Sequence, residues 1–265
     1  MLEMTSLTTN NSDRIMGQNE TVKKSNSEMI VMANAGETPI SRCTIEALVG
    51  RQLNDVERKL ASNIFYVSGS MPLPLPTPRV SIVGSRKASP EGLLAARTIA
   101  KILVEKEVVI VSGLAEGIDT AAHETAIEAG GRTIAVLGTP LNKTYPSKNF
   151  KLQQEIMRHH LAISQFQIGR HTIPKDFVVR NRTMALISDA TIIVEALDTS
   201  GSLHQGWEAL RLGRSLFIWK SIVNNHKLHW SEKMLQYGAI KLSDPADVFE
   251  SLPSSLEMPL EIHSE

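Results

Sequence analysis

Cysteine is almost missing from this sequence, since Cys43 is the only one among 265 residues. A single cysteine cannot close a disulfide within the chain or build a cysteine zinc site, and its scarcity fits a reducing compartment. No stretch approaches about 18 consecutive apolar residues, and the N-terminus has neither the basic nor the apolar segment of a secretory signal. We therefore expect a soluble, cytoplasmic protein without a membrane partner.

Several catalytic signatures are missing as well. The Gly-x-Ser-x-Gly turn of serine hydrolases does not occur, and the eight histidines form no cluster with metal-site spacing. Gly113 and Gly117 resemble part of a dinucleotide fingerprint, but its first glycine is absent and no acidic residue follows at the end of the second predicted strand. These absences argue against hydrolase, metal and nicotinamide chemistry. We expect no cofactor and no catalytic residue.

Net charge is zero over the chain but not over its parts. Residues 1–78 carry 7 Lys or Arg and 8 Asp or Glu, residues 79–243 carry 21 and 14, and residues 244–265 carry none and 6. A basic central region is compatible with a polyanionic partner. The simpler interpretation of the acidic end is a solvated tail.

Composition divides the chain into four segments. Residues 1–40, rich in Ser, Thr, Asn, Glu and Met without periodicity, are expected to be disordered or loosely ordered. Residues 41–78 are expected to form one or two short helices, from helical spacing up to Ile64, followed by a stiff Pro-rich linker over residues 71–78. Residues 79–243 are predicted to be the main domain, and residues 244–265 an acidic tail.

Apolar strands alternate with amphipathic helices in the main domain. The predicted strands are 80–83, 108–111, 133–137, 161–164, 191–194, 215–219 and 239–242. The predicted helices are 90–105, 118–129, 149–159, one with residues 180–182 near its start, and one capped by residues 200–202. This alternation predicts an α/β fold, a Rossmann-like, doubly wound, mostly parallel sheet that binds ligands at the carboxyl ends of its strands, with a short helical N-terminal appendage.

Two glycine-bearing turns end the first two of these strands. Gly84-Ser85-Arg86 and the turn from Gly113 to Gly117 lead into helices whose first N–H groups have no intrahelical partner. Gly84 lets the backbone approach a phosphate, and the guanidinium of Arg86 offers a two-pronged set of donors. An anion is therefore expected at the edge that both turns reach.

A basic segment is expected near the same edge. Lys175, Arg180 and Arg182 place three cations close to Phe177. Cations that neutralise phosphates beside a ring that stacks a base are what single-stranded nucleic acid requires. The alternative is an exposed basic helix without a ligand.

Two acidic residues on this edge have more than one interpretation. Asp119 lies four residues before His123 on one helix, where it can pair with His123 or with the neighbouring loop. Glu195 ends a strand and, with Ser200-Gly201, closes the edge. Its carboxylate could hold the arginines or accept a hydrogen bond from a ribose hydroxyl, and the sequence does not choose between these roles.

These motifs together resemble the DNA-processing protein A family, also called Smf. The resemblance covers residues 79 to about 242 and rests on the segments 80–92, 111–123, 133–138, 145–146, 177, 180–182, 194–196 and 200–201. It implies a Rossmann-like core that binds single-stranded DNA as a homodimer, protects incoming strands during natural transformation and helps to load the RecA recombinase.

The resemblance also implies roles for particular residues. The implied strand-binding residues are Gly84, Ser85, Arg86, Gly113, Lys175, Phe177, Arg180 and Arg182. The implied supporting residues are Gly117, Asp119, Asn181, Glu195, Ser200 and Gly201. We expect the arginines to neutralise successive phosphates, the backbone N–H groups of Ser85 and Gly113 to donate to them, and Phe177 to stack a base.

The sequence departs from the family pattern in several places. Gln165 stands where the family has glutamate, Trp219-Lys220-Ser221 replaces a Pro-Gly, and residues 222–226 replace a glycine-rich segment. The N-terminal helical domain is short, and we expect the acidic tail in place of the C-terminal winged helix found in many members. These changes predict remodelled loops on one side of the edge.

Three functions of different classes remain open. The first is a non-catalytic single-stranded-DNA-binding protein of DNA processing, uptake or recombination. The second is an antitoxin or nucleic-acid sensor in an anti-phage module, with a cognate toxin as partner. The third is a nucleotide N-glycosidase, because the core is similar to the lysine-decarboxylase-like family, whose Pro-Gly-Gly-x-Gly-Thr motif corresponds here to residues 195–201. The arginine-bearing loops and the basic core favour the first function.

Overall fold

The structure, a computed structural model, describes residues 38–225 and 228–253. Its strands are β1 (Ser41–Cys43), β2 (Phe65–Gly69), β3 (Arg79–Gly84), β4 (Val109–Ser112), β5 (Thr133–Leu137), β6 (Leu161–Ser164), β7 (Ala190–Glu195), β8 (Ser215–Trp219) and β9 (Ile240–Leu242). Its α-helices are α1 (Ile45–Val49), α2 (Asp55–Leu60), α3 (Pro90–Val104), α4 (Ile118–Glu128), α5 (Phe150–His159), α6 (Pro174–Ile187), α7 (Ser202–Arg211), α8 (Lys220–Val223) and α9 (His229–Gln236). It also has the 3-10 helices η1 (Ser147–Asn149) and η2 (Pro245–Ser251).

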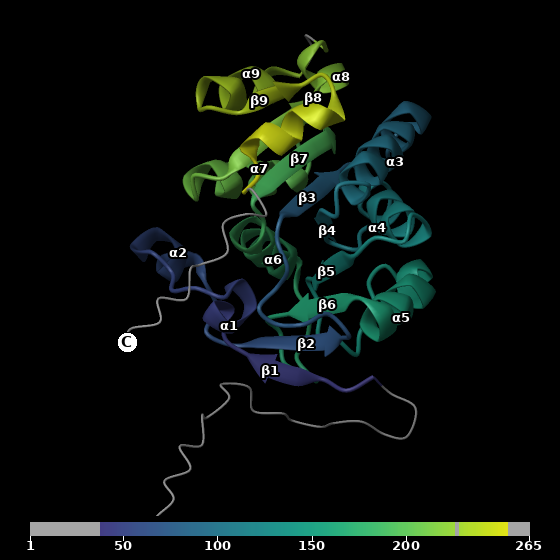
Figure 1. The fold of residues 1–265 in the computed structure, drawn as a ribbon, viewed down its shortest axis with the longest axis vertical. Coiled ribbons are helices and arrows are strands. Elements are labelled where there is room, and N and C mark those ends of the chain that lie inside the picture. The colour runs from purple at the N-terminus through teal and green to yellow at the C-terminus, as the bar shows by residue number, and fades with distance from the viewer. Residues whose placement is uncertain (1–37, 226–227, 254–265) are drawn as a thin grey trace, which may run out of the picture.

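The strands of the described chain form one nine-stranded sheet in the order β1-β2-β6-β5-β4-β3-β7-β8-β9 (Figure 1). Neighbouring strands from β6 to β9 are parallel, whereas β2 is antiparallel to both β1 and β6. The chain runs from β3 through β4 and β5 to β6, then returns to the other side of β3 as β7. This reversal confirms the predicted Rossmann-like, doubly wound sheet and places its switch point between β3 and β7.

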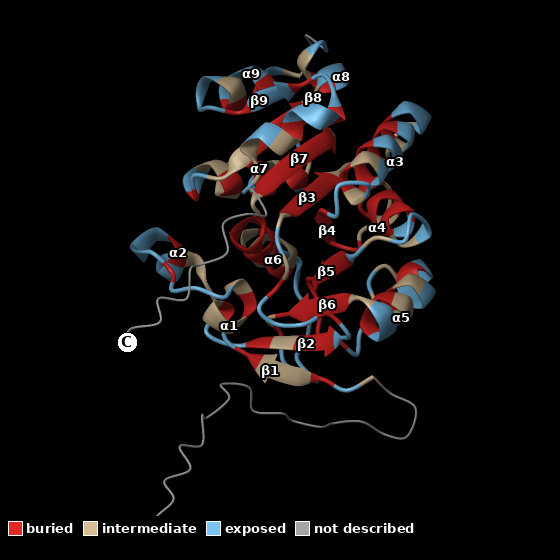
Figure 2. Cartoon of the chain, in the orientation of Figure 1, coloured by how far each residue is buried: buried red, intermediate tan, exposed pale blue. Residues whose placement is uncertain are grey.

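The sheet is covered on both faces. Every residue of β4 and β5 is buried, as the continuous apolar runs of a parallel sheet predict (Figure 2). On one face, Ile99 and Leu103 of α3 pack in a cluster with Ile82 of β3. On the other, Met184 of α6 packs in a cluster with Ile193 of β7. Alternate residues of each strand thus point into two separate apolar layers.

Most elements predicted for the main domain are confirmed. The seven predicted strands and the helices α3, α4 and α5 agree with the observed bounds to within one residue at each end. The start of α3 follows the predicted pattern, because Pro90 takes the first helical position and Ser89 Oγ accepts a hydrogen bond from the Gly92 N–H at 3.0 Å. Long apolar runs and a capping serine therefore located these elements reliably.

The region before the main domain was predicted only in part. Two short helices are present, but the strands β1 and β2 were missed, and the sheet therefore continues across the boundary drawn at residue 79. The apolar residues Val56 and Ile64, which follow the helical spacing of this region, are exposed rather than buried. The Pro-rich run is packed rather than free, since Met71 and Leu75 are buried in the core. Strands as short as β1 carry too little periodicity to be recognised.

Three further expectations need correction. Arg180 lies in the middle of α6 rather than near its start, because the helix already begins at Pro174. Gly201 is the residue before α7, and no side chain caps that helix; the Ser200 hydroxyl instead accepts a hydrogen bond from the Leu197 N–H at 2.8 Å. The helices α8 and α9 were not predicted.

The two ends of the chain lie largely outside the described residues. Predictions for residues 1–37 and 254–265 therefore stay predictions. The first part of the expected acidic tail is structured, because it forms η2, in which Val248 is buried. Asp244, the residue before this helix, caps it by accepting a hydrogen bond from the Ala246 N–H at 2.9 Å. Within the described part of the chain, no helix combines the length and apolarity needed to cross a membrane.

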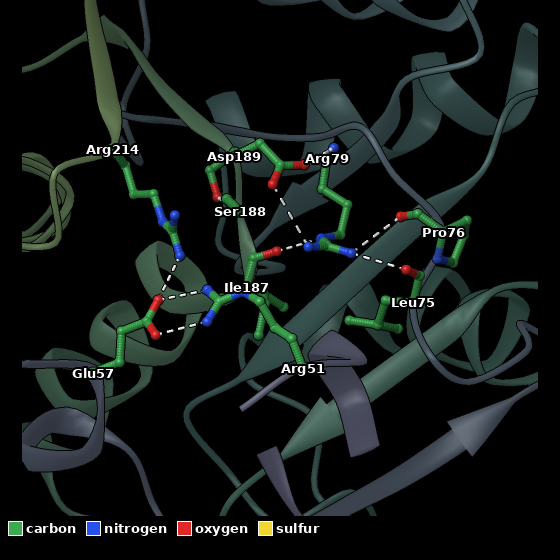
Figure 3. A network of polar contacts seen from close by, with 10 residues as sticks. Arg51, Glu57, Leu75, Pro76, Arg79, Ile187, Ser188, Asp189 and Arg214 are labelled. Atoms are coloured by element: carbon green, nitrogen blue, oxygen red, sulfur yellow. Dashed lines mark hydrogen bonds and ion pairs between the residues drawn. The ribbon is translucent and has the colours of Figure 1, made fainter. Parts of the chain in front are cut away.

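A polar network joins the first helices to the main domain (Figure 3). Glu57 of α2, whose side chain is 1% exposed, forms ion pairs with Arg51 at 2.6 Å and with Arg214, just before β8, at 2.7 Å. Hydrogen bonding to Arg51 lowers the pKa of Glu57 from 4.5 to about 2. One buried carboxylate thus connects segments that are 157 positions apart in the sequence.

A second part of the network surrounds Arg79, the first residue of β3. Its guanidinium donates hydrogen bonds to the carbonyl of Ile187, to that of Leu75 at 2.9 Å and to that of Pro76 at 3.3 Å (Figure 3). Its backbone N–H donates to Asp189 Oδ2 at 2.7 Å, and the two side chains form an ion pair at 3.6 Å. The Pro-rich run is therefore bound to the turn between α6 and β7.

We expect Glu57→Gln to lower the free energy of unfolding at pH 7 by about 2 kcal/mol, because two arginines lose a charged acceptor. The pKa of Glu57 is depressed in the folded state, so its contribution is complete above about pH 4.5 and is lost as the pH falls towards 2. Urea denaturation between pH 7 and pH 3 should therefore show a steeper loss of stability for the wild type than for the variant.

Asp55→Asn provides a matched control on the same helix. Asp55 pairs with Arg58 at 3.3 Å, but its side chain is 90% exposed. Removal of this surface pair should change the free energy of unfolding by less than about 0.5 kcal/mol. Equal effects of the two substitutions would contradict a special role for Glu57.

Candidate nucleic-acid interface

A pocket of about 780 Å³ opens at the carboxyl ends of the central strands. Its walls come from the loops that follow β3, β4, β5 and β7 and from the first turns of α6 and α7. The pocket therefore lies at the switch point between β3 and β7, where a doubly wound sheet is expected to bind its ligands.

Two of the predicted glycines allow the loops at this edge to approach each other. A methyl group on Gly84 would lie 2.6 Å from a side-chain carbon of Ile118 and 2.8 Å from the Glu195 carbonyl oxygen. Gly117 has a φ of +75°, and a methyl group there would clash with the Ser85 carbonyl. These glycines are thus required for contact between the two turns, which confirms that both turns reach one edge of the sheet.

Arg180 is buried at the base of the pocket and 5% exposed. Its Nη1 donates to the carbonyls of Gly113, after β4, and Val136, in β5, the latter at 2.8 Å, and its Nε donates to Asn181 Oδ1 at 2.9 Å. Burial lowers the pKa of Arg180, and the charge of Asp119 opposes that effect. The guanidinium thus joins α6 to two central strands, and its Nη2 alone makes no hydrogen bond within the described chain.

Asp119 pairs with the neighbouring loop rather than with His123. Its Oδ2 accepts hydrogen bonds from the N–H groups of Gly113 at 3.1 Å and Ala115 at 3.3 Å. Burial raises the pKa of Asp119, while the nearby Arg180 guanidinium and these N–H groups oppose that shift. His123 instead contacts Thr133 Oγ1 at 2.6 Å, and burial lowers the pKa of His123 to about 3. The Gly113 N–H expected to bind phosphate therefore already has an acceptor.

The carboxylate of Glu195 contacts no described arginine and so does not take the first of its two expected roles. It accepts hydrogen bonds from the Ser89 N–H at 3.1 Å and from the Ser89 hydroxyl at 2.5 Å, and so holds the residue that caps α3. Its backbone carbonyl accepts the Ser85 N–H at 2.7 Å, so this second expected phosphate donor is also engaged. Asn181 similarly binds the Gly201 carbonyl at 3.1 Å. These supporting residues connect the loops around the pocket.

The accessible cations of the pocket are only partly those predicted. Arg86 is exposed on the pocket wall and forms no ion pair with another described residue, and the structure adds Lys87 and Lys143, both exposed. Lys175 and Arg182 do not line the pocket; Arg182 pairs with Glu208 at 3.0 Å. Lys87 directly follows Arg86, so its position in the sequence was a signal that could have identified it.

Two aromatic rings meet on the same wall. Tyr145 and Phe177 have ring centroids 5.2 Å apart, with their planes inclined by 52°. The guanidinium carbon of Arg86 lies 5.7 Å from the centroid of Phe177. Phe177 was predicted as a site residue, whereas Tyr145 was noted only as part of a motif. A cation, two rings and further lysines thus share one concave surface.

The family of this chain follows from comparison with known proteins. A model of the family described as DNA recombination-mediator protein A matches residues 48–253. The chain belongs to the DNA recombination-mediator protein A family. Within this family, it is 37% identical to DNA processing protein DprA of Streptococcus pneumoniae over 187 residues and 32% identical to protein Smf of Escherichia coli over 179 residues. The predicted resemblance is therefore confirmed.

Solved structures of family members have the same fold. The structure of DprA from S. pneumoniae superimposes with a TM-score of 0.68 at 31% identity and covers 83% of this chain and 76% of that one. The structure of DprA from Helicobacter pylori, a protein described as having a unique single-stranded DNA binding mode, gives a TM-score of 0.64 at 26% identity and covers 76% and 93% of the two chains.

The chain spans only part of its relatives' length. The alignments cover 70% of this chain and 65% of S. pneumoniae DprA, and 67% of this chain and 48% of E. coli Smf. The family match over residues 48–253 contains the parallel core and every residue that lines the pocket.

The close contact between Gly113 and Arg180 can be tested by substitution. A methyl group at Gly113 would clash with the guanidinium, so we expect Gly113→Ala to lower the free energy of unfolding by about 1–3 kcal/mol. Gly201→Ala is the control, because nothing lies within 4 Å of a methyl group there and the φ of −62° suits alanine. Urea denaturation should show a change below about 0.5 kcal/mol for this control. Equal stability of both variants would contradict the described position of Arg180.

Proposed function

We propose that this chain binds single-stranded DNA in the pocket at the switch point and acts in DNA processing during recombination or uptake. The contacts are made to phosphates and to the faces of bases, so binding is independent of sequence. The observation that carries the proposal is the charge distribution in the pocket.

Positive charge dominates the described wall of the pocket. Arg86, Lys87, Lys143 and Arg180 line it, and Asp119 is the one acidic residue on the described wall. Asp119 is 5% exposed and directed towards backbone N–H groups, so its charge is compensated locally. Exposed cations without ion-pair partners are those that phosphates neutralise most readily, because no existing pair must be broken.

The size and lining of the pocket suit a nucleotide unit. A volume of about 780 Å³ lies within the usual range for sites that enclose a small ligand. Apolar and aromatic residues, among them Val178, Met184 and Phe177, alternate with the cations. This mixture fits a base and its phosphates better than a phosphate alone. The single-stranded DNA binding mode described for H. pylori DprA supports the same ligand class.

The arrangement of Glu195 and His123 favours binding over the N-glycosidase alternative. Glu195, the carboxylate that the N-glycosidase alternative would use, is bonded to Ser89 at the start of α3. His123, the histidine on the pocket-side helix α4, is fully buried and bonded to Thr133. Neither group is available at the pocket surface to transfer a proton to a ligand.

The remaining assignments stay predictions that rest on the resemblance. They comprise the homodimer, an interaction with a RecA-type recombinase, and phosphate contacts by Lys175 and Arg182. For Arg182, such a contact would require the ion pair with Glu208 to open. No contact within the described residues specifically favours the antitoxin alternative.

Fluorescence anisotropy of a labelled poly-dT oligonucleotide, measured at several salt concentrations with duplex DNA as competitor, tests the proposal. We expect binding that prefers the single strand and weakens steeply with salt. Arg86→Ala should weaken binding about tenfold at low salt and lower the slope of log K against log salt by about 0.7, the value for one lost phosphate contact.

Arg158→Ala is the matched control. Arg158 is an exposed arginine in the last turn of α5, which leads into the start of β6 and thus lies at the edge of the sheet opposite the pocket. Its loss should leave both affinity and salt slope unchanged. Absence of binding by the wild type at low salt, or equally tight binding by Arg86→Glu, would overturn the proposed function.

A further inference from the structure

We propose that Tyr145 is the residue that stacks on a base in this pocket, and that Phe177 is a positioning residue that holds Tyr145 and Arg86. The proposal rests on the proposed function, because it identifies which ring receives the base of a bound strand. It follows from how the two rings are covered and how the loop of Tyr145 is fixed.

The ring of Phe177 is only partly exposed and already has several neighbours. A methyl group on Gly138 would come within 2.5 Å of its Cδ1 atom, so the ring packs directly on the backbone after β5. Tyr145 lies 5.2 Å away between centroids, and the Arg86 guanidinium lies 5.7 Å from the ring centre. These neighbours leave less of the Phe177 ring open to a base than of the Tyr145 ring, which is exposed.

Tyr145 offers the free aromatic surface. It is 51% exposed and lines the large pocket. Together with Phe177 and Arg86, it also lines a smaller adjoining cavity of about 50 Å³. The ring therefore stands between the two cavities, with one part supported by Phe177 and the rest open to solvent. Exposed aromatic rings beside cations are the platforms on which single-stranded nucleic acids stack.

The loop that carries Tyr145 is held at both ends. Before the tyrosine, Thr139 Oγ1 donates to the Lys143 carbonyl at 2.7 Å, and Gln153 Nε2 donates to the Leu141 carbonyl at 2.8 Å. These bonds fix the loop against itself and against α5. The backbone that leads to Tyr145 is thus fixed in the absence of a ligand.

The residues after the tyrosine are tied to the loop that follows β4. Asn149 Nδ2 donates to the Leu114 carbonyl and to Thr120 Oγ1, both at 2.9 Å, and Lys148 pairs with Glu116 at 2.8 Å. An aromatic side chain presented by a fixed loop loses little conformational entropy when a base stacks on it. This preorganisation distinguishes Tyr145 from an ordinary exposed tyrosine.

The surroundings of Tyr145 also select for an unpaired base. Lys143, two residues earlier, is exposed on the same wall, and the Arg86 guanidinium lies beside Phe177. A base on Tyr145 would thus have two cations in the same pocket for its flanking phosphates. Both faces of a base in a duplex are already stacked, so this contact favours single-stranded DNA and accepts any of the four bases.

The test compares variants in the anisotropy experiment. Tyr145→Leu, which keeps an apolar side chain without a π-face, should weaken binding of the poly-dT oligonucleotide about tenfold, and Tyr145→Phe should bind within about twofold of the wild type. Neither substitution removes a charge, so the slope of log K against log salt should stay unchanged, unlike that of Arg86→Ala. An abasic oligonucleotide of equal length should bind equally well to the wild type and Tyr145→Leu.

A control and a second variant separate stacking from general damage. Tyr237→Leu alters a tyrosine that is 66% exposed at the end of α9 and contacts Trp207, not the pocket; its binding should be unchanged. Phe177→Leu should also weaken binding. The double variant Tyr145→Leu, Phe177→Leu should bind about as tightly as the weaker of the two single variants, because both substitutions remove the same stacking contact by Tyr145.

The outcomes separate this proposal from the proposed function. If Tyr145→Leu binds poly-dT like the wild type while Arg86→Ala is impaired, the strand-binding function holds and the role of Tyr145 is refuted. Phe177 is instead the stacking residue if Tyr145→Leu binds like the wild type and Phe177→Leu binds poly-dT more weakly than the wild type but binds the abasic oligonucleotide equally well. If the wild type binds no oligonucleotide at low salt, both proposals fail together.

Discussion

The arrangement of the pocket depends on one buried contact, in which the Arg180 guanidinium of α6 reaches the carbonyls that follow β4 and lie in β5. The ladder between β4 and β5 ends at the Ser112–Ala135 pair, so the Gly113 and Val136 carbonyls lie beyond it, and a buried carbonyl needs a donor. Arg180 supplies that donor and at the same time fixes the distance between α6 and the sheet. Phe177, one turn earlier on α6, is thereby set against Gly138. The Arg180 side chain therefore positions both the base of the pocket and the wall that contains Phe177.

The basic character of the pocket arises from how acidic groups are used rather than from a large excess of cations. Asp119, Asp176 and Glu195 all lie near it, but each accepts hydrogen bonds from backbone N–H groups, and Asp176 also pairs with Arg170 at 2.6 Å. Their charges thus stabilise loops and helix starts. Arg86 and Lys143 have no such partners within the described chain, so the field that a ligand meets at the surface is positive although the whole sequence is neutral.

The sequence allowed the parallel core to be predicted closely and the site only in part. Long apolar strands and the Ser89-Pro90 start have strong local signals, whereas β1 and α8 are too short to have one. Whether a charged residue faces solvent or a partner is decided by residues far away in sequence. Arg180 and Arg86 look alike in the sequence, yet one binds carbonyls beneath the pocket and the other is exposed on its wall. The contact between Tyr145 and Phe177 likewise depends on the tertiary structure and has no local signal in the sequence.

The antiparallel strand β2 has a consequence for association between copies of the chain. It pairs with β6 from Tyr66–Ser164 to Gly69–Leu161 and thereby occupies backbone groups that would otherwise be open. Every residue of β6 is buried, and three of the four are apolar. A chain that began at β3 would expose this strand as a flat, uncharged edge, which is a template for intermolecular sheet growth. The first two strands therefore protect the chain from aggregation, and this role is independent of ligand binding in the pocket.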